Sequence, residues 1–244
     1  MKTKWHALLR GWPLLVALMA FGATAASTDV RVWGNFGRLM HTGDASAQVV
    51  LADAGIGRGD YGVGALAQMR GEIWVWDGRV LVSRGHDEDG RTEPPRDGDA
   101  AALLAVVRVG GWREVPVPRD LPQPEFERFV LEQAQAHRID VERPFAFAVR
   151  GPVTALAWHV VTGTASAAHG ARHALGHAAS RRFTAARTDG VLLGLYSASA
   201  LEGVVSHPGE RFHVHFATSD DARSGHVDAY AVAAGAVLLL PVPQ

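Results

Sequence analysis

Three histidines in the C-terminal part of the chain have the spacing of metal ligands. His213 and His215 lie two residues apart in FHVHF, and His226 follows a turn-rich segment, SDDARSG. Side chains alternate between the two faces of a β-strand, so His213 and His215 share one face and the apolar residues beside them share the other. A turn at SDDARSG would bring His226 back beside the pair on a neighbouring strand. Three neutral imidazoles at one point are typical of a catalytic zinc or iron site.

The HxH pattern alone has a second interpretation. Two surface histidines on an exposed strand give the same spacing, and the chain holds 12 histidines. The alternating Phe212, Val214 and Phe216, together with the returning His226, favour the metal site over that interpretation. Another group, His169, His173 and His177, has helical spacing, but neighbouring glycines weaken a helix there, so a surface segment is the better prediction.

The elements that must position these residues are mostly β-strands. Short apolar or alternating runs separated by turn residues fill residues 30–82, 103–109 and the region from 145 onward. Asp77-Gly78 predicts a tight hairpin, and the charged stretch 86–99 predicts an exposed loop. One clear helix is expected within residues 121–140, because Pro124 suits its first turn and Phe126 and Val130 begin an apolar stripe.

The fold class expected from these patterns is α+β and predominantly β, with two closely packed β-rich subdomains. The N-terminal subdomain is expected over residues 26–150 and includes the helix. The C-terminal subdomain is expected over residues 151–244 and carries the three-histidine metal site. A chain of this length can bury a sizeable core.

The beginning of the chain predicts export. Lys2, Lys4 and Arg10 precede an apolar run at 13–26, and Ala23-Thr24-Ala25 suits signal peptidase. Residues 1–25 are therefore expected to be a secretory signal peptide, with a periplasmic or extracellular protein and no stable membrane contact after its removal. The run is shorter than the roughly 20 residues that span a bilayer, which makes an uncleaved anchor the minor alternative.

Composition excludes several partners and bonds. The chain has 24 lysines and arginines against 25 aspartates and glutamates, so no nucleic-acid partner is expected. It has no cysteine, which excludes disulfides and thiolate metal ligands.

Residues 190–230 resemble the metal-binding region of the α-acetolactate decarboxylase family. They carry P-G, H-x-H-F, D-D and G-H-V in the family's order. A second match lies upstream, where YGVGALAQMRGEIWVWDGRV resembles the family's GxGTF…LDGEMxxLDGxxY and places Glu72 on its active-site glutamate. PFAFAVRG resembles the stretch before the family's central strand. The resemblance extends over roughly residues 30–241.

The resemblance implies a function and its site. His213, His215 and His226 would hold a divalent metal, with zinc the expected ion, in a carbon–carbon lyase that converts 2-acetolactate to acetoin and CO₂. A metal chelated by the substrate oxygens would stabilise the charge left by decarboxylation. Glu72 would act as the general acid/base, since burial raises the pKa of a carboxyl group. The small molecule is a 2-hydroxy-3-oxo acid, and a homodimer is the usual assembly.

The chain departs from the family pattern in three places. The family's substrate-facing arginine aligns with His159, which can donate a hydrogen bond but lacks the fixed charge and fork of a guanidinium. The threonine of GTF is Ala65, and no acidic residue follows Asp228 where the family has one in its C-terminal tail. Arg211, in a small insertion before the first ligand, is a candidate replacement cation.

Two other classes remain open from the sequence. A cupin-like iron or manganese oxygenase also uses HxH, but it normally has a glutamate about four residues after the second histidine, where this chain has Ser219, Asp220 and Asp221. A non-catalytic small-molecule binding module on the same scaffold would explain the altered site residues.

Overall fold

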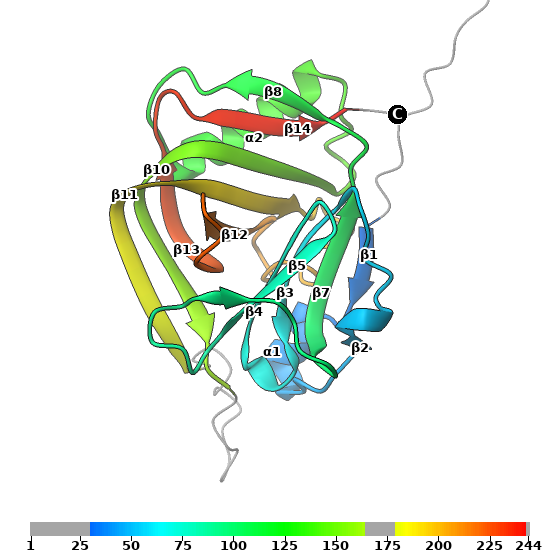
Figure 1. The fold of residues 1–244 in the computed structure, drawn as a ribbon. Coiled ribbons are helices and arrows are strands. Elements are labelled where there is room, and N and C mark those ends of the chain that lie inside the picture. Colours follow the sequence, from blue (N-terminus) through cyan, green and yellow to red (C-terminus); the bar gives the residue numbers. More distant parts are fainter. Residues whose placement is uncertain (1–29, 164–178, 243–244) are drawn as a thin grey trace, which may run out of the picture.

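Two seven-stranded β-sheets make up most of the protein in the computed structural model, which describes residues 30–163 and 179–242 (Figure 1). The first sheet has the order β1 (Val30–Trp33), β7 (Ala100–Arg108), β3 (Asp60–Leu66), β4 (Gly71–Trp76), β5 (Arg79–Arg84) and β6 (Thr92–Glu93), and β2 (Val49–Val50) also pairs with β7. The second has the order β8 (Trp112–Pro116), β14 (Val237–Pro241), β10 (Phe145–Val161), β11 (Ser180–Tyr196), β12 (Phe212–Thr218), β13 (Ser224–Val232) and β9 (Leu121–Pro122). The expected predominantly β, two-part fold is confirmed.

The second sheet closes partly on itself. β10 pairs with β11 along one edge, and along its other edge it pairs first with β14 and then with β13. β13 also pairs with β12, and β12 with β11, so β10 to β13 form a ring of hydrogen-bonded strands. This closure brings β13 next to both β12 and β10, which is what gathers side chains from three strands at one place.

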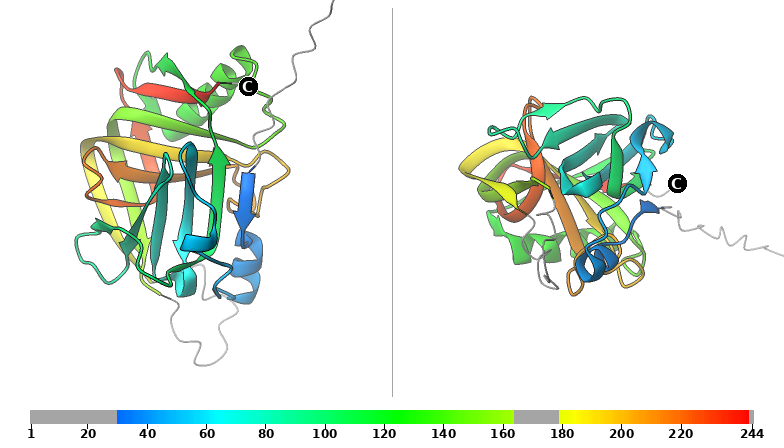
Figure 2. Two further views of the ribbon diagram at one scale, coloured as in Figure 1. Left: turned by 45° about the vertical axis from the view of Figure 1, so that its right-hand side comes forward. Right: turned by 90° about the horizontal axis from the view of Figure 1, so that it is seen from below.

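The two sheets pack through a shared apolar layer. Trp74 and Val107 of the first sheet belong to the same buried cluster as Ala146, Leu193 and Leu239 of the second. Figure 2 shows the first sheet lying against the long strands β10 and β11. Burial of these side chains is the main force that holds the sheets together.

The predicted hairpin is confirmed at Asp77-Gly78, which joins β4 to β5. Both turn residues have positive φ, 49° for Asp77 and 82° for Gly78, as a two-residue type I′ turn requires. A Cβ on Gly78 would lie 2.4 Å from the backbone of Gly57, so only glycine fits the close approach of these two loops.

The predicted helix is also confirmed, as α2 (Gln123–Ala136). Phe126, Val130 and Ala134 lie fully buried in the core cluster on the outer side of the second sheet.

A shorter helix, α1 (Phe36–Thr42), begins at an Asn35 cap that accepts a hydrogen bond from the Arg38 N–H. Sequence patterns gave no sign of α1 because it has two turns and buries only Leu39. Two 3₁₀ turns are Leu51–Asp53 and Ala67–Met69.

The chain passes from one sheet to the other near residue 110. β8, β9 and α2 precede residue 150 but belong to or pack on the second sheet, and β10 runs unbroken through residue 150. Sheet membership therefore does not change at the expected 150/151 division. The predicted signal peptide and the group of His169, His173 and His177 lie outside the described residues. Within residues 30–163 and 179–242, every helix is too short or too polar to cross a membrane.

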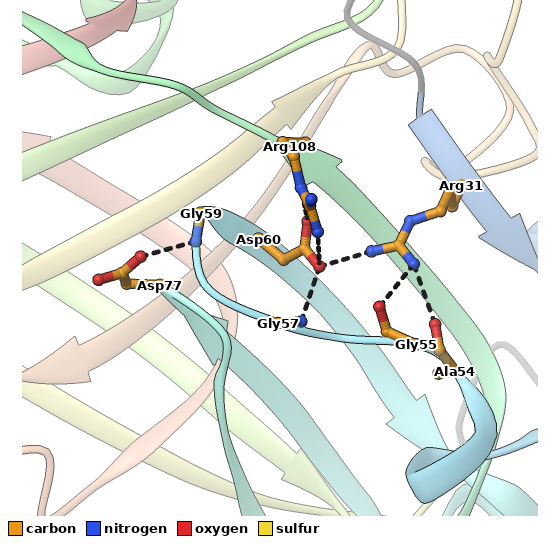
Figure 3. Close-up of polar contacts among 8 residues, drawn as sticks. All are labelled: Arg31, Ala54, Gly55, Gly57, Gly59, Asp60, Asp77 and Arg108. Carbon is orange, nitrogen blue, oxygen red and sulfur yellow. Dashed lines mark hydrogen bonds and ion pairs between the residues drawn. The ribbon is translucent and has the colours of Figure 1, made fainter.

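A buried carboxylate fixes the end of the first sheet (Figure 3). Asp60, fully buried at the start of β3, accepts hydrogen bonds from Arg31 at 2.7 Å, from Arg108 at 2.9 and 3.0 Å, and from the Gly57 N–H at 2.9 Å. Burial by itself would raise the pKa of Asp60, but the hydrogen bonds and the two guanidinium charges lower it overall. β1, β3 and β7 are thereby linked by one ionised side chain.

Candidate active site

The three predicted ligands come together on two adjacent strands. His213 and His215 point to one side of β12, while Val214 and Phe216 belong to the core cluster on the other side. His226 lies directly opposite His215 on β13. His213 Nε2 is 3.1 Å from His226 Nδ1 and 3.2 Å from His215 Nε2, and the three nitrogens lie within 4.8 Å of one another.

These nitrogens fit a divalent metal ion. With metal–nitrogen bonds of 2.0–2.1 Å, two ligands of a tetrahedral site are separated by about 3.3 Å, close to the spacing found here. Burial lowers the pKa of His213 to about 4 and lowers those of His215 and His226 well below the ordinary value, so all three rings are neutral at pH 7. His213 Nδ1 donates to the Val205 carbonyl at 2.6 Å, which leaves the lone pair on Nε2.

Glu72 lies beside the three histidines, although it belongs to the first sheet. It lies on β4, and its Oε2 is 3.8 Å from His215 Nε2. Its Oε1 accepts a hydrogen bond from the Val161 N–H at 3.3 Å. Burial raises the pKa of Glu72 to about 7, against the opposing effects of the His159 charge and of the Val161 hydrogen bond. The side chain can therefore exchange a proton near neutral pH.

His159 lies beside the ligands, at the centre of a polar group on three strands. Its register partners are His226 on β13 and Arg182 on β11. Its Nδ1 is 2.8 Å from Asp228 Oδ1, and the other oxygen of Asp228 is 3.5 Å from Arg182 Nη1. Burial favours the neutral ring, but the Asp228 hydrogen bond and the charges of Glu72 and Asp228 outweigh it and raise the pKa of His159.

Apart from His215, these side chains line a cavity of about 290 Å³ between the sheets. The second sheet supplies most of the polar lining, and α1 and the first sheet supply most of the apolar lining. The polar lining consists of Glu72, His159, Ser180, Arg182, His207, His213, His226 and Asp228. The apolar lining consists of Phe36, Leu39, Met40, Ala65, Met69, Leu103 and Val161, with Gly64. α1 supplies part of the apolar side, which gives this unpredicted helix a place in the site.

Sequence reasoning missed four of the polar lining residues: Ser180, Arg182, His207 and Asp228. Asp228 follows His226 by two residues, so strand alternation alone could have placed it on the same face. Arg182 is brought in by its register with His159, which no local pattern shows. His207 comes from the loop before β12, where its ring lies 4.1 Å from that of Phe36.

Arg211, the candidate replacement cation, lies outside the cavity lining. It donates to Glu202 at 3.1 Å and to Ser199 at 3.3 Å, and it is not among the described residues that line the cavity. Its charge is already paired on the surface. Ala65, in contrast, does line the cavity, so the missing threonine hydroxyl is a change within the site.

The protein is thus predominantly β and has three histidines that could hold a metal ion, with a buried glutamate beside them at a small cavity. The family model for Alpha-acetolactate decarboxylase matches residues 40–242, and the chain is a member of that family. No curated protein sequence matches this chain closely enough to count as a relative.

Solved structures show the same fold. Alpha-acetolactate decarboxylase from Bacillus subtilis strain 168 aligns with a TM-score of 0.72 and 16% identity, over 87% of this chain and 85% of that chain. Acetolactate decarboxylase from Bacillus subtilis subspecies spizizenii gives the same values. A Staphylococcus aureus protein of unknown function similar to alpha-acetolactate decarboxylase aligns with a TM-score of 0.68 and 16% identity, over 86% and 84% of the two chains.

Proposed function

We propose that this protein is a metal-dependent carbon–carbon lyase that converts 2-acetolactate to acetoin and CO₂. The observation that carries the proposal is the cluster of His213, His215 and His226, whose ligand nitrogens all lie within 4.8 Å of one another, next to the buried carboxyl group of Glu72. Membership of the α-acetolactate decarboxylase family supports the same substrate. Zinc is the proposed ion because three imidazoles with an open position are a common catalytic zinc site.

The reaction needs charge stabilisation and one proton. A divalent ion held by His213, His215 and His226 would supply positive charge to balance the negative charge that develops on the substrate oxygens as CO₂ leaves. The electron pair of the broken carbon–carbon bond must then take up a proton at carbon to give acetoin. Glu72, with a pKa of about 7, is protonated in a large fraction of molecules near neutral pH and can donate that proton from Oε2. Water returns a proton to the carboxylate afterwards.

The surrounding residues orient the substrate and restrict water. Phe36, Leu39 and Met69 give the cavity an apolar side against which the methyl groups of 2-acetolactate can pack. The opposite side presents His159, whose Nδ1 pairs with Asp228. The raised pKa of His159 favours the imidazolium, in which the other ring nitrogen also carries a proton and can donate to a substrate oxygen.

The oxygenase alternative receives no support from the turn after β12. Asp220 accepts hydrogen bonds from Thr218 and the Ala222 N–H, and Asp221 pairs with Arg79 at 2.7 Å. Neither aspartate lines the cavity. These side chains are therefore not positioned as a fourth ligand.

We also propose export and dimer formation. Export rests on the basic and apolar pattern of residues 1–25, and a homodimer rests on the family resemblance alone. Cell fractionation, together with mass spectrometry of the N-terminus of the exported protein, tests export. An uncleaved chain in the cytoplasm would contradict it. Sedimentation of the purified protein tests dimer formation, and a monomer at micromolar concentration would contradict it.

The decisive experiment combines metal analysis with an acetoin assay on racemic 2-acetolactate. We expect about one metal ion per chain, loss of acetoin formation after chelation, and recovery with zinc. An exposed-histidine variant, His86→Ala, serves as the matched control and should behave like the wild type. Full metal occupancy without acetoin would favour the binding module, and metal-dependent oxygen consumption would favour the oxygenase.

A further inference from the structure

We propose that Arg182 binds the carboxylate of the substrate, an inference that rests on the proposed function in taking the substrate to be an anionic acid. Arg182 lies on β11 directly opposite His159 of β10, and both side chains line the cavity. The fixed positive charge that the sequence does not provide at position 159 is thus present on the neighbouring strand.

The charges inside the cavity favour this role. Arg182 is the sole lysine or arginine among the described lining residues. The three ligand histidines are neutral, and Asp228 is acidic and repels an anion. His159, whose pKa is raised, is already paired with Asp228 at 2.8 Å and lacks the fork of a guanidinium. A guanidinium stays charged at every working pH and can hold both oxygens of a carboxylate with its planar fork. Among these groups Arg182 has the chemistry best suited to an anionic ligand.

The Arg182 side chain is available to a ligand. It is 69% exposed, and its contact with Asp228 is 3.5 Å, longer than the 2.7–2.9 Å of a charge-assisted hydrogen bond. That contact orients the guanidinium, while N–H groups remain for a second partner. Asp228 is itself held by His159 at 2.8 Å, so the pair keeps Arg182 at the cavity lining.

Neighbouring arginines of the same strand do not share this position. Arg181 faces the other way, as strand alternation requires, and donates to the Gly85 carbonyl at 3.0 Å. Arg187 is exposed further along β11 and does not line the cavity. Arg187 is therefore a matched control for charge removal on the same strand.

The test compares a carboxylate with its neutral isostere. Titration calorimetry of the metal-loaded protein would measure binding of 2-hydroxy-2-methylpropanoate and of the corresponding primary amide. Arg182→Gln should weaken carboxylate binding about 10–100-fold and leave amide binding unchanged, since a charge-assisted pair is lost only for the anion. Arg187→Gln should change neither affinity. Arg182→Lys should restore part of the loss, because it keeps the charge without the fork.

The results separate this inference from the proposed function. Equal effects of Arg182→Gln on acid and amide, or no effect on either, would overturn the role of Arg182. If the wild type makes acetoin and the Gln variant keeps its KM, the decarboxylase stands and the Arg182 inference fails. If no protein makes acetoin but the variant loses its preference for the acid, the Arg182 inference stands and the decarboxylase fails. Metal content and thermal unfolding of each variant confirm that the site is intact.

Discussion

Glu72 and His215 lie 3.8 Å apart although they belong to different sheets, Glu72 to β4 and His215 to β12. A general acid must lie within reach of the reacting atoms, and here the packing of the sheets provides that proximity. The geometry of the site therefore depends on the packing of the two sheets against each other.

The metal site gives the first prediction. His213→Ala should reduce bound zinc steeply, because two remaining imidazoles hold the ion much less firmly than three. Elemental analysis after dialysis measures this, and His86→Ala, an exposed substitution, should retain the wild-type content. Added zinc should also raise the thermal midpoint of the wild type and not that of His213→Ala. Equal zinc content in all three proteins would refute the three-histidine site.

The role of Glu72 gives the second prediction. Glu72→Gln should lower kcat about 10²–10⁴-fold, the usual contribution of general acid/base catalysis, and leave zinc content unchanged. Glutamine keeps an oxygen for the Val161 N–H, so the local structure should be maintained. Steady-state acetoin kinetics provide the measurement, with exposed Glu88→Gln as the control. Loss of zinc in Glu72→Gln would instead make Glu72 a metal ligand, and unchanged kcat would remove it from the reaction.

The contact between His159 and Asp228 gives the third prediction. Because the two side chains share one 2.8 Å hydrogen bond, His159→Gln and Asp228→Asn should each lower kcat/KM about 10-fold or more. The double variant should be little worse than the less active single variant, corresponding to a coupling free energy of about 1–3 kcal/mol. Combining His159→Gln with exposed Asp97→Asn should be additive. If the losses in kcat/KM from His159→Gln and Asp228→Asn simply add in the double variant, the two residues act independently.

The buried carboxylate of Asp60 gives the fourth prediction, on stability. Asp60→Asn should lower the free energy of unfolding at pH 7 by about 1–3 kcal/mol, because hydrogen bonds from Arg31 and Arg108 lose their charged acceptor. Urea unfolding of this variant and of the exposed control Asp97→Asn measures the effect.

The pH dependence of that effect has a defined sign. The pKa of Asp60 is lower in the folded protein than the ordinary value of 3.8, so the ionised side chain stabilises the fold above that pH. The contribution is lost as the pH falls through the folded-state pKa. The difference between wild type and Asp60→Asn should therefore be full at pH 7 and shrink in acid. A difference that is constant down to pH 2 would show that the charge of Asp60 does not stabilise the fold.

Local patterns in the sequence predicted the features that depend on a few neighbouring residues. The period of two placed His213 and His215 on one face of a strand, Asp77-Gly78 indicated the hairpin, and the apolar stripe from Phe126 indicated α2. The family motifs placed Glu72 and the three histidines in one site, and the structure brings them together. These signals are local because alternation and turn geometry are set by the backbone of adjacent residues.

The tertiary structure decided what depends on the pairing of distant strands. The register of β10 with β11 and β13 placed Arg182 and Asp228 beside His159. Arg211 instead pairs with Glu202 at the surface. Strand β10 runs without a break across residue 150, where the division between subdomains was expected. Strand order and register are set by the packing of the whole core rather than by the residues of one strand, so the local sequence pattern does not specify them.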